Sequence, residues 1–280
     1  MKKRISTGIC ILISTVLLVI FSNYPVYPIV LSLLALRGAF ELLRAVGTDK
    51  NLIIALPAYV FTTVFPTAAY FVSDNTAVTY ALALASLLFV YMLMLMFVSV
   101  FSKGKVSFAK TAEIFMSITY ISVAFSTLSL LRYLNRETGA FLIALVFIVS
   151  WVCDAGAYFI GSLCGKHKLI PEISPKKTVE GAIGGIVIAT AAFLVYGMIL
   201  DYFVEAMTVN YWILFVLGVL LSIVSQLGDL VASLIKREYG VKDYGRLFPG
   251  HGGVMDRFDS TISVSTLLMI LCAVFPPFTF

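Results

Sequence analysis

The segment YWILFVLGVLLSIVSQLGDLVASLI, residues 211–235, decides the class of fold. It is apolar almost throughout, and a helix of about 20 such residues is long enough to cross the hydrocarbon core of a bilayer. The whole chain has a similar character, because 60% of its 280 residues are hydrophobic and only 12% are charged. A water-soluble domain of this length does not have that composition. We therefore predict an integral membrane protein.

Further apolar runs of similar length lie on both sides of this segment. The first follows Met1-Lys2-Lys3-Arg4 but ends without a small-residue cleavage site, so we expect it to be retained as a helix rather than removed as a signal peptide. The runs predict an all-α, polytopic integral membrane protein with a single membrane domain over residues 1–280. Its nine predicted transmembrane helices are 5–22, 27–43, 51–72, 78–101, 111–131, 139–162, 179–200, 211–235 and 258–275.

Basic residues in the connecting loops predict the orientation. If the nine helices alternate in direction, seventeen of the twenty Lys and Arg residues fall on one side of the membrane. Loops rich in Lys and Arg stay in the cytoplasm. We therefore predict a cytoplasmic N-terminus, an outside C-terminus and a multi-pass protein of the cell (inner) membrane. The two longest polar loops, 163–178 and 236–257, would then face the cytoplasm.

A polar stripe runs along the 211–235 segment. Its members are Ser222, Ser225, Gln226, Asp229 and Ser233. Offsets of three, four and seven place them on one helical face, which must point to the protein interior or a wet cavity because lipid offers no hydrogen-bond partner. A carboxylate at this depth costs about 3 kcal/mol to insert, so Asp229 is a candidate functional residue. The alternative is a structural pairing with a neighbouring helix.

The loop after this segment combines glycines, cations and carboxylates. Glycines let backbone N–H groups approach an anion closely, and a loop that enters a helix can bind phosphate. Asp256 and Asp259 are three residues apart at the start of the last predicted helix, so they share a face. Together with Asp229 they would repel one another unless a cation lay among them, and all-oxygen donors favour Mg²⁺. We predict a Mg²⁺ site at Asp229, Asp256 and Asp259, with the number of ions left open and the last two helices adjacent.

A second cluster precedes the seventh predicted helix. Asp154 lies in the sixth apolar run, and Ser174-Pro175-Lys176-Lys177-Thr178 comes directly before the seventh. Pro175 favours extended backbone, and the two lysines and the Thr178 hydroxyl could bind a phosphate at a helix start. The alternative is that this run is only an insertion signal and a helix N-cap.

The residues from 233 to 259 resemble the signature of phosphatidate cytidylyltransferases, also called CDP-diacylglycerol synthases. The matching positions are Ser233, Lys236, Arg237, Lys242, Asp243, Pro249, His251, Gly252, Gly253, Asp256, Arg257 and Asp259. The stretches around Trp151, Asp154, Gly165 and Ser174–Gly181 are also similar to family patterns, whereas Gly161-Ser162 departs from the expected Gly-Arg. The resemblance implies that residues 136–280 form the catalytic part and residues 1–135 the N-terminal helices.

The same resemblance implies an activity and its partners. CTP and phosphatidate, a membrane lipid, would give CDP-diacylglycerol and pyrophosphate for phospholipid synthesis, in a homodimer without a nucleic-acid partner. The predicted catalytic residues are Asp229, Asp256, Asp259, Lys236, Arg237 and His251, although His251 could serve only to shape its turn. The predicted substrate-binding residues are Lys176, Lys177, Thr178, Ser174, Lys242, Asp243, Gly252, Gly253, Arg257 and Asp154.

Two other functions remain open at the level of sequence. One is a CTP-dependent enzyme that acts on another lipid phosphate or a polyprenol. The other is a membrane transporter, in which the intramembrane carboxylates and the pair Arg37 and Glu41 would line a pathway. No duplicated half supports transport, and we interpret Arg37 and Glu41 as a buried structural ion pair.

Overall fold

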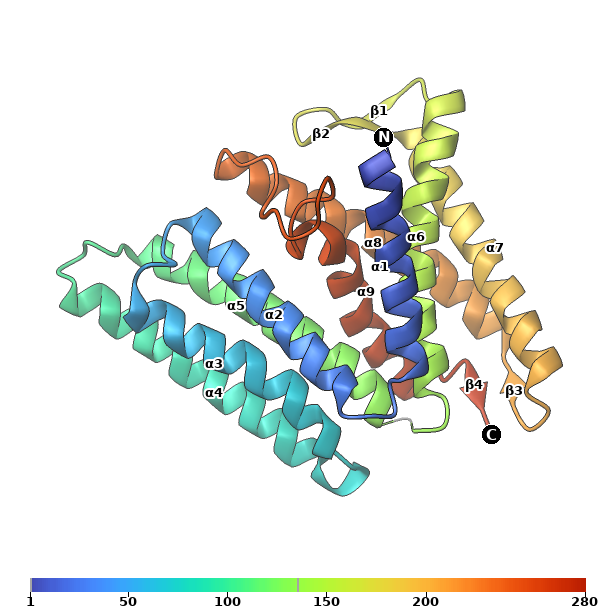
Figure 1. The fold of residues 1–280 in the computed structure, drawn as a ribbon, viewed down its shortest axis with the longest axis horizontal. Helices are drawn as coiled ribbons and strands as arrows, with labels where there is room; N and C mark the ends of the chain where they lie inside the picture. The colour runs from blue at the N-terminus through green and yellow to red at the C-terminus, as the bar shows by residue number, and fades with distance from the viewer. Residues whose placement is uncertain (1, 135) are drawn as a thin grey trace. The chain divides into compact units, whose positions relative to one another are not determined.

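The computed structural model describes residues 2–134 and 136–280, and helices dominate it (Figure 1). Within this part of the chain there are nine α-helices. Their bounds are α1 Lys2–Ile20, α2 Val26–Val46, α3 Leu52–Ala68, α4 Asp74–Phe101, α5 Phe108–Tyr133, α6 Gly139–Cys164, α7 Val179–Phe203, α8 Tyr211–Glu238 and α9 Met255–Val274, and a 3₁₀ turn, η1 Ala69–Phe71, extends α3. Every predicted apolar run coincides with one of these helices.

Seven helical segments in the described residues are long and apolar enough to cross a membrane. They are α3 with η1, and α4 to α9. The all-α polytopic membrane fold is thereby confirmed. The count of nine crossings stays a prediction, because α1 and α2 are not among these seven.

The chain groups into two compact units. The first comprises residues 1–135 and 241–256, and the second comprises residues 136–240 and 257–280. The loop 241–256 groups with the N-terminal helices. The division into N-terminal helices over residues 1–135 and a catalytic part over residues 136–280 stays a prediction.

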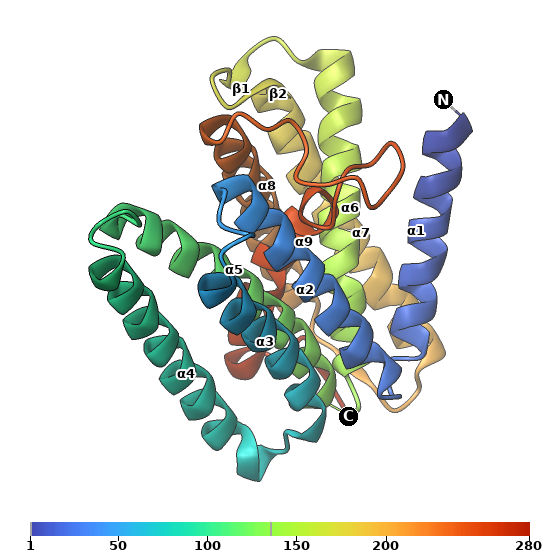
Figure 2. The same ribbon diagram turned by 60° about the vertical axis from the view of Figure 1, so that its left-hand side comes forward.

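In the first unit α2 packs against α3 and α5 (Figure 2), and α4 also contacts α5. The Ser32 hydroxyl on α2 lies 2.6 Å from the Thr67 hydroxyl and donates to the Thr63 carbonyl on α3 at 2.9 Å. Such polar contacts between helices satisfy groups for which lipid offers no partner. They fix α2, whose C-terminal half carries Arg37, Glu41 and Arg44.

In the second unit α6, α7 and α8 pack together through small residues. A Cβ on Gly185 of α7 would lie 2.8 Å from the Cys153 carbonyl of α6, and one on Gly218 of α8 would lie 2.9 Å from the Thr190 Cα of α7. Close backbone approach of this kind is how membrane helices gain packing without a hydrophobic driving force. This packing brings α6, α7 and α8 close together around the polar stripe of α8.

Two short β-ladders that the sequence did not predict lie outside the helices of the second unit. Strands β1 (Lys168–Ile170) and β2 (Ser174–Thr178) form an antiparallel hairpin before α7, and β3 (Thr208–Val209) pairs with β4 (Phe278–Thr279). Pro175 keeps the second strand of the hairpin extended, as expected for that residue. The hairpin delivers Lys176 and Lys177 to the start of α7.

Candidate functional site

A pocket of about 290 Å³ in the second unit gathers many of the predicted site residues. Its walls come from α6, the β1–β2 hairpin, the start of α7 and the polar face of α8. The lining residues are Asp154, Ala157, Tyr158, Gly161, Ser162, Leu169, Lys176, Lys177, Thr178, Gly181, Ala182, Gln226 and Asp229. Five of the predicted residues, Asp154, Lys176, Lys177, Thr178 and Asp229, therefore meet at one cavity.

Thr178 fixes the junction between the hairpin and α7. It is the N-cap of α7, and its hydroxyl accepts a hydrogen bond from the Gly181 N–H at 3.1 Å. A Cβ on Gly161 of α6 would lie 2.8 Å from that hydroxyl oxygen, so only glycine lets the two elements come this close. The N-cap named as the alternative for this run is thus present, and it holds the preceding lysines in place.

The central contact of the pocket is an ion pair between Lys177 and Asp229. Lys177 Nζ lies 2.5 Å from Asp229 Oδ2, and the two side chains are 23% and 26% exposed. Asp154 interacts electrostatically with both of these groups and with Arg257. A cation is thus held among carboxylates beside a cavity, where it can contact either Asp229 or an anion that enters.

Asp229 also meets Asp259 of α9. The two carboxyl groups interact electrostatically with each other, and Lys236 interacts electrostatically with both. A Cβ on Gly228 would lie 2.9 Å from the Asp259 carbonyl, so α8 and α9 are in close contact, as predicted. Asp259 is only 7% exposed, and its Oδ1 accepts from the Ser260 N–H at 2.9 Å. The polar stripe of α8 therefore faces the interior.

The paired carboxyl groups fit a divalent cation by their chemistry. Two carboxylates repel at hydrogen-bonding range unless a proton or a cation lies between them, and oxygen donors suit Mg²⁺. Within residues 2–134 and 136–280, no group of three or more His, Cys, Asp or Glu side chains could hold a metal ion by itself. A Mg²⁺ ion at Asp229 and Asp259 would thus need further oxygen ligands, and substrate phosphates commonly supply them.

In the first unit Asp256 organises the loop that carries the signature. Its Oδ2 accepts hydrogen bonds from the Tyr244 N–H at 2.8 Å and the Gly253 N–H at 2.9 Å. Gly252 has φ +85° and a Cβ there would lie 2.6 Å from Asp256 Oδ2, so glycine is required for both reasons. Asp256 thereby closes the signature loop within the first unit.

Glu41 is a second carboxylate that holds this loop. Its Oε1 accepts from Arg37 Nε at 3.1 Å and its Oε2 accepts from the Met255 N–H at 3.0 Å, with Glu41 1% exposed. The predicted Arg37–Glu41 ion pair is present. The bond to Met255 was not predicted, and it ties α2 to the start of α9. Side chains on Gly245 or Gly253 would collide with the Glu41 carboxylate.

The other predicted residues have separate positions. His251 lies against α1, since a Cβ on Gly8 would be 3.7 Å from its Nε2. Arg237 Nε donates to the Ile173 carbonyl at 3.3 Å, which links the end of α8 to the hairpin, and Ser174 begins β2. Lys242 and Asp243 line a cavity of the first unit.

Two polar residues outside the predicted site set also join elements of the second unit, and one of them, Gln226, lines the pocket. Gln226 Nε2 donates to the Ala182 carbonyl at 3.1 Å, which joins α8 to α7. Glu180 Oε1 lies 2.6 Å from His167 Nδ1, and its Oε2 accepts from the Lys166 N–H at 3.1 Å. Glu180 thereby fastens the loop after α6 to the first turn of α7. The position of Gln226 on the polar stripe was the sequence signal for its contact.

Comparison with known proteins gives the family. The sequence matches the Cytidylyltransferase family over residues 2–275. The chain belongs to this family. It is 45% identical over 173 residues to proteins named phosphatidate cytidylyltransferase from Staphylococcus haemolyticus (strain JCSC1435) and Staphylococcus saprophyticus subsp. saprophyticus, and 44% identical to one from Staphylococcus aureus (strain COL). Each match covers 62% of this chain and 63% of the relative's length.

Membership of the Cytidylyltransferase family confirms the resemblance seen in the signature. Lys176 and Lys177 place two cations on the wall of the second-unit pocket.

Proposed function

We propose that this protein is a phosphatidate cytidylyltransferase that converts CTP and phosphatidate into CDP-diacylglycerol and pyrophosphate, in the synthesis of phospholipids. The observation that carries the proposal is the second-unit pocket, in which Lys176 and Lys177 lie beside Asp154 and Asp229. Cations bind phosphates, and paired carboxylates bind the cation that accompanies them. Family membership supports an enzyme over the alternative of a transporter.

The reaction needs no nucleophilic side chain. A phosphate oxygen of phosphatidate, already an anion, attacks the α-phosphorus of CTP and forms a new P–O bond. The bond from the α-phosphorus to the oxygen that bridges it to the β-phosphate breaks, and pyrophosphate leaves with that electron pair. Positioning and charge neutralisation therefore supply most of the catalysis.

Lys177 has the most direct role among the described groups. Its ammonium can exchange the carboxylate of Asp229 for a phosphate oxygen with little movement, because the ion pair borders the cavity. Lys176 would bind a phosphate from the same strand, and Arg257 and Lys236 would add positive charge near Asp154 and Asp259. The cap at Thr178 keeps the two lysines oriented.

The proposed cofactor is Mg²⁺. Asp229 and Asp259 are its best-placed ligands, whereas Asp256, assigned to the same ion from the sequence, has one oxygen engaged by two backbone N–H groups. When bound, the ion would neutralise charge on the substrate phosphates. Substrate phosphates would supply its remaining ligands.

The proposed setting is the cell (inner) membrane, with the site open to the cytoplasm, where CTP is found. The excess of Lys and Arg on one side of the predicted helices supports this orientation. We also propose a homodimer, on the family resemblance alone. Cross-linking in native membranes followed by mass measurement tests it.

The test of the function uses purified protein with labelled CTP, phosphatidate and Mg²⁺. The label should enter the organic phase as CDP-diacylglycerol, with one pyrophosphate released for each lipid formed. A parallel reaction with polyprenol or another lipid phosphate tests the alternative acceptor. Absence of transfer to phosphatidate by a folded preparation would refute the proposal.

A further inference from the structure

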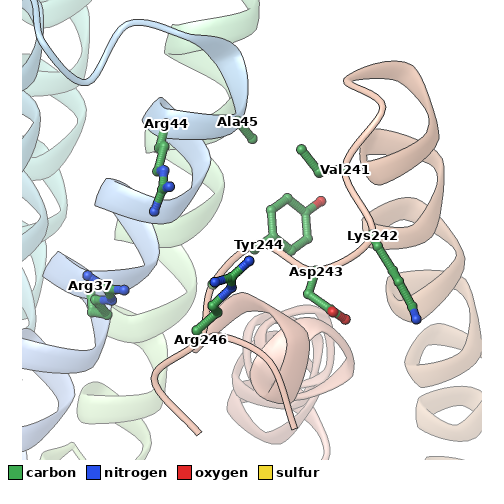
Figure 3. A pocket seen from close by; sticks show the side chains of 9 residues that line it. Arg37, Arg44, Ala45, Val241, Lys242, Asp243, Tyr244 and Arg246 are labelled. Atoms are coloured by element: carbon green, nitrogen blue, oxygen red, sulfur yellow. The ribbon is translucent and has the colours of Figure 1, made fainter. Parts of the chain in front are cut away.

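A second cavity, of about 640 Å³, lies within the first unit between α2 and the loop that follows α8. Figure 3 shows Arg37 and Arg44 projecting from α2 on one side, and the loop with Lys242, Asp243, Tyr244 and Arg246 on the other. Ala45, Val241 and Gly245 complete its lining. It shares no residue with the second-unit pocket.

The lining of this basic pocket carries an excess of positive charge. The lining contains four basic residues, Arg37, Arg44, Lys242 and Arg246, and one carboxylate, Asp243. Arg37 is paired with the buried Glu41, and among the residues that the structure describes Arg44, Lys242 and Arg246 form no ion pair. Like charges that converge on one cavity repel, and an anion would offset that repulsion.

The walls of the basic pocket are held in place before any ligand arrives. Tyr244 is 5% exposed, and its N–H is bound by Asp256. Glu41 anchors Arg37 on one wall and the Met255 N–H at the end of the loop. Because both walls are fixed, little ordering of the backbone opposes binding.

The chemistry of the lining selects the class of ligand. Guanidinium groups bind phosphate oxygens through paired N–H donors, and a cavity of this size lies in the range of about 300–1,000 Å³ typical of small-molecule sites. One or two cations suffice for a single phosphate, whereas this pocket presents three cations, Arg44, Lys242 and Arg246, that form no ion pair within the described part of the chain, beside the paired Arg37. The charge of the lining therefore matches an anion with several phosphate groups.

We propose that the basic pocket is a polyphosphate-binding site that takes pyrophosphate or the triphosphate tail of a nucleotide, with Arg44 and Arg246 as its principal contacts. The sequence assigned only Lys242 and Asp243 of this pocket to substrate. The assignment of pyrophosphate as a natural ligand rests on the proposed function, which releases it, but binding is measured without turnover.

The experiment measures inorganic pyrophosphate binding to the full-length protein in detergent by calorimetry, in metal-free buffer so that the proposed Mg²⁺ site does not contribute. The double variant Arg44→Gln, Arg246→Gln is compared with Lys50→Gln, Lys105→Gln, which removes the same charge from exposed positions of the same unit. The pocket variant should raise the Kd about tenfold or more, and the control should keep the affinity of the parent. Both variants should keep the parent's unfolding temperature.

Other outcomes overturn the proposal. Absence of pyrophosphate binding by the parent, or equal affinity in both double variants, would show that the pocket is not a polyphosphate site. A second arm with phosphatidate in mixed micelles covers the other source of phosphate: loss of lipid binding alone in the pocket variant would assign the pocket to a lipid headgroup instead. The parent could bind pyrophosphate through Arg44 and Arg246 and yet transfer no cytidylyl group. That result would refute the proposed function but support the polyphosphate-binding site.

Discussion

Replacing Glu41 tests whether the signature loop depends on a carboxylate from α2. Glu41→Ala removes the acceptor of the Met255 N–H and the partner of Arg37, at a position that is 1% exposed. An unsatisfied buried N–H costs about 1–3 kcal/mol, and a hydrogen bond to a charged group contributes about 1.5–3 kcal/mol. We expect a loss of about 2–4 kcal/mol. By the scaling for domains of similar size, this is a fall in Tm of roughly 5–10 °C.

The assay is thermal unfolding in one detergent, with two comparison variants. Glu41→Gln keeps an oxygen that can accept from Met255, so it should lose about half as much stability as the alanine variant. Glu113→Gln removes an exposed ion pair with Lys110, whose side chains are 37% and 30% exposed, and should cost less than about 1 kcal/mol. Equal Tm values for the parent and Glu41→Ala would refute the anchoring role.

Three further predictions address the second-unit pocket and the orientation of the chain. Lys177→Ala should raise the KM for CTP or phosphatidate by about tenfold while the protein stays folded, because it removes a phosphate contact. Unchanged kinetics would show that Lys177 serves only as a membrane-insertion signal. Thr178→Ala should cost about 1 kcal/mol in thermal unfolding by loss of the cap of α7, and Thr178→Ser should behave like the parent; equal loss in both would argue against the cap. In a cysteine-free variant, single cysteines at Lys105 and Leu247 should be shielded from an impermeant thiol reagent in intact cells, and one at Glu205 should react; the reverse pattern would invert the topology.

The hydropathy of the sequence was sufficient to predict the helices. Each apolar run is a helix because the backbone must satisfy its hydrogen bonds within the segment when lipid surrounds it. The offsets along α8 likewise predicted the inward face on which Ser222, Ser225 and Gln226 are buried. The argument that carboxylates gather around a shared cation led us to expect Asp229 near Asp259, and the two side chains interact although they are on different helices.

The contacts that close the signature loop could not be predicted in this way. Glu41 and Met255 are 214 residues apart, and no periodic pattern links them. Asp256 and Asp259 have the spacing of one helical face, but Asp256 lies in the first turn of α9, where its carboxylate can reach the N–H groups of the preceding loop. The β1–β2 hairpin is too short and too polar to give a strand pattern.

The central claim is that Asp229 and Asp259 hold the cation that neutralises the phosphates during cytidylyl transfer. Its most direct test is the turnover of Asp259→Asn and Asp229→Asn over a Mg²⁺ titration, with thermal unfolding measured on the same preparations. The substitutions keep the size of the side chain and remove the charge that binds the ion. We predict a fall in turnover of about a hundredfold or more, a higher Mg²⁺ requirement for the residual activity, and an unchanged or slightly raised Tm because two carboxylates no longer repel. Turnover close to that of the parent at an unchanged Mg²⁺ dependence would contradict the account.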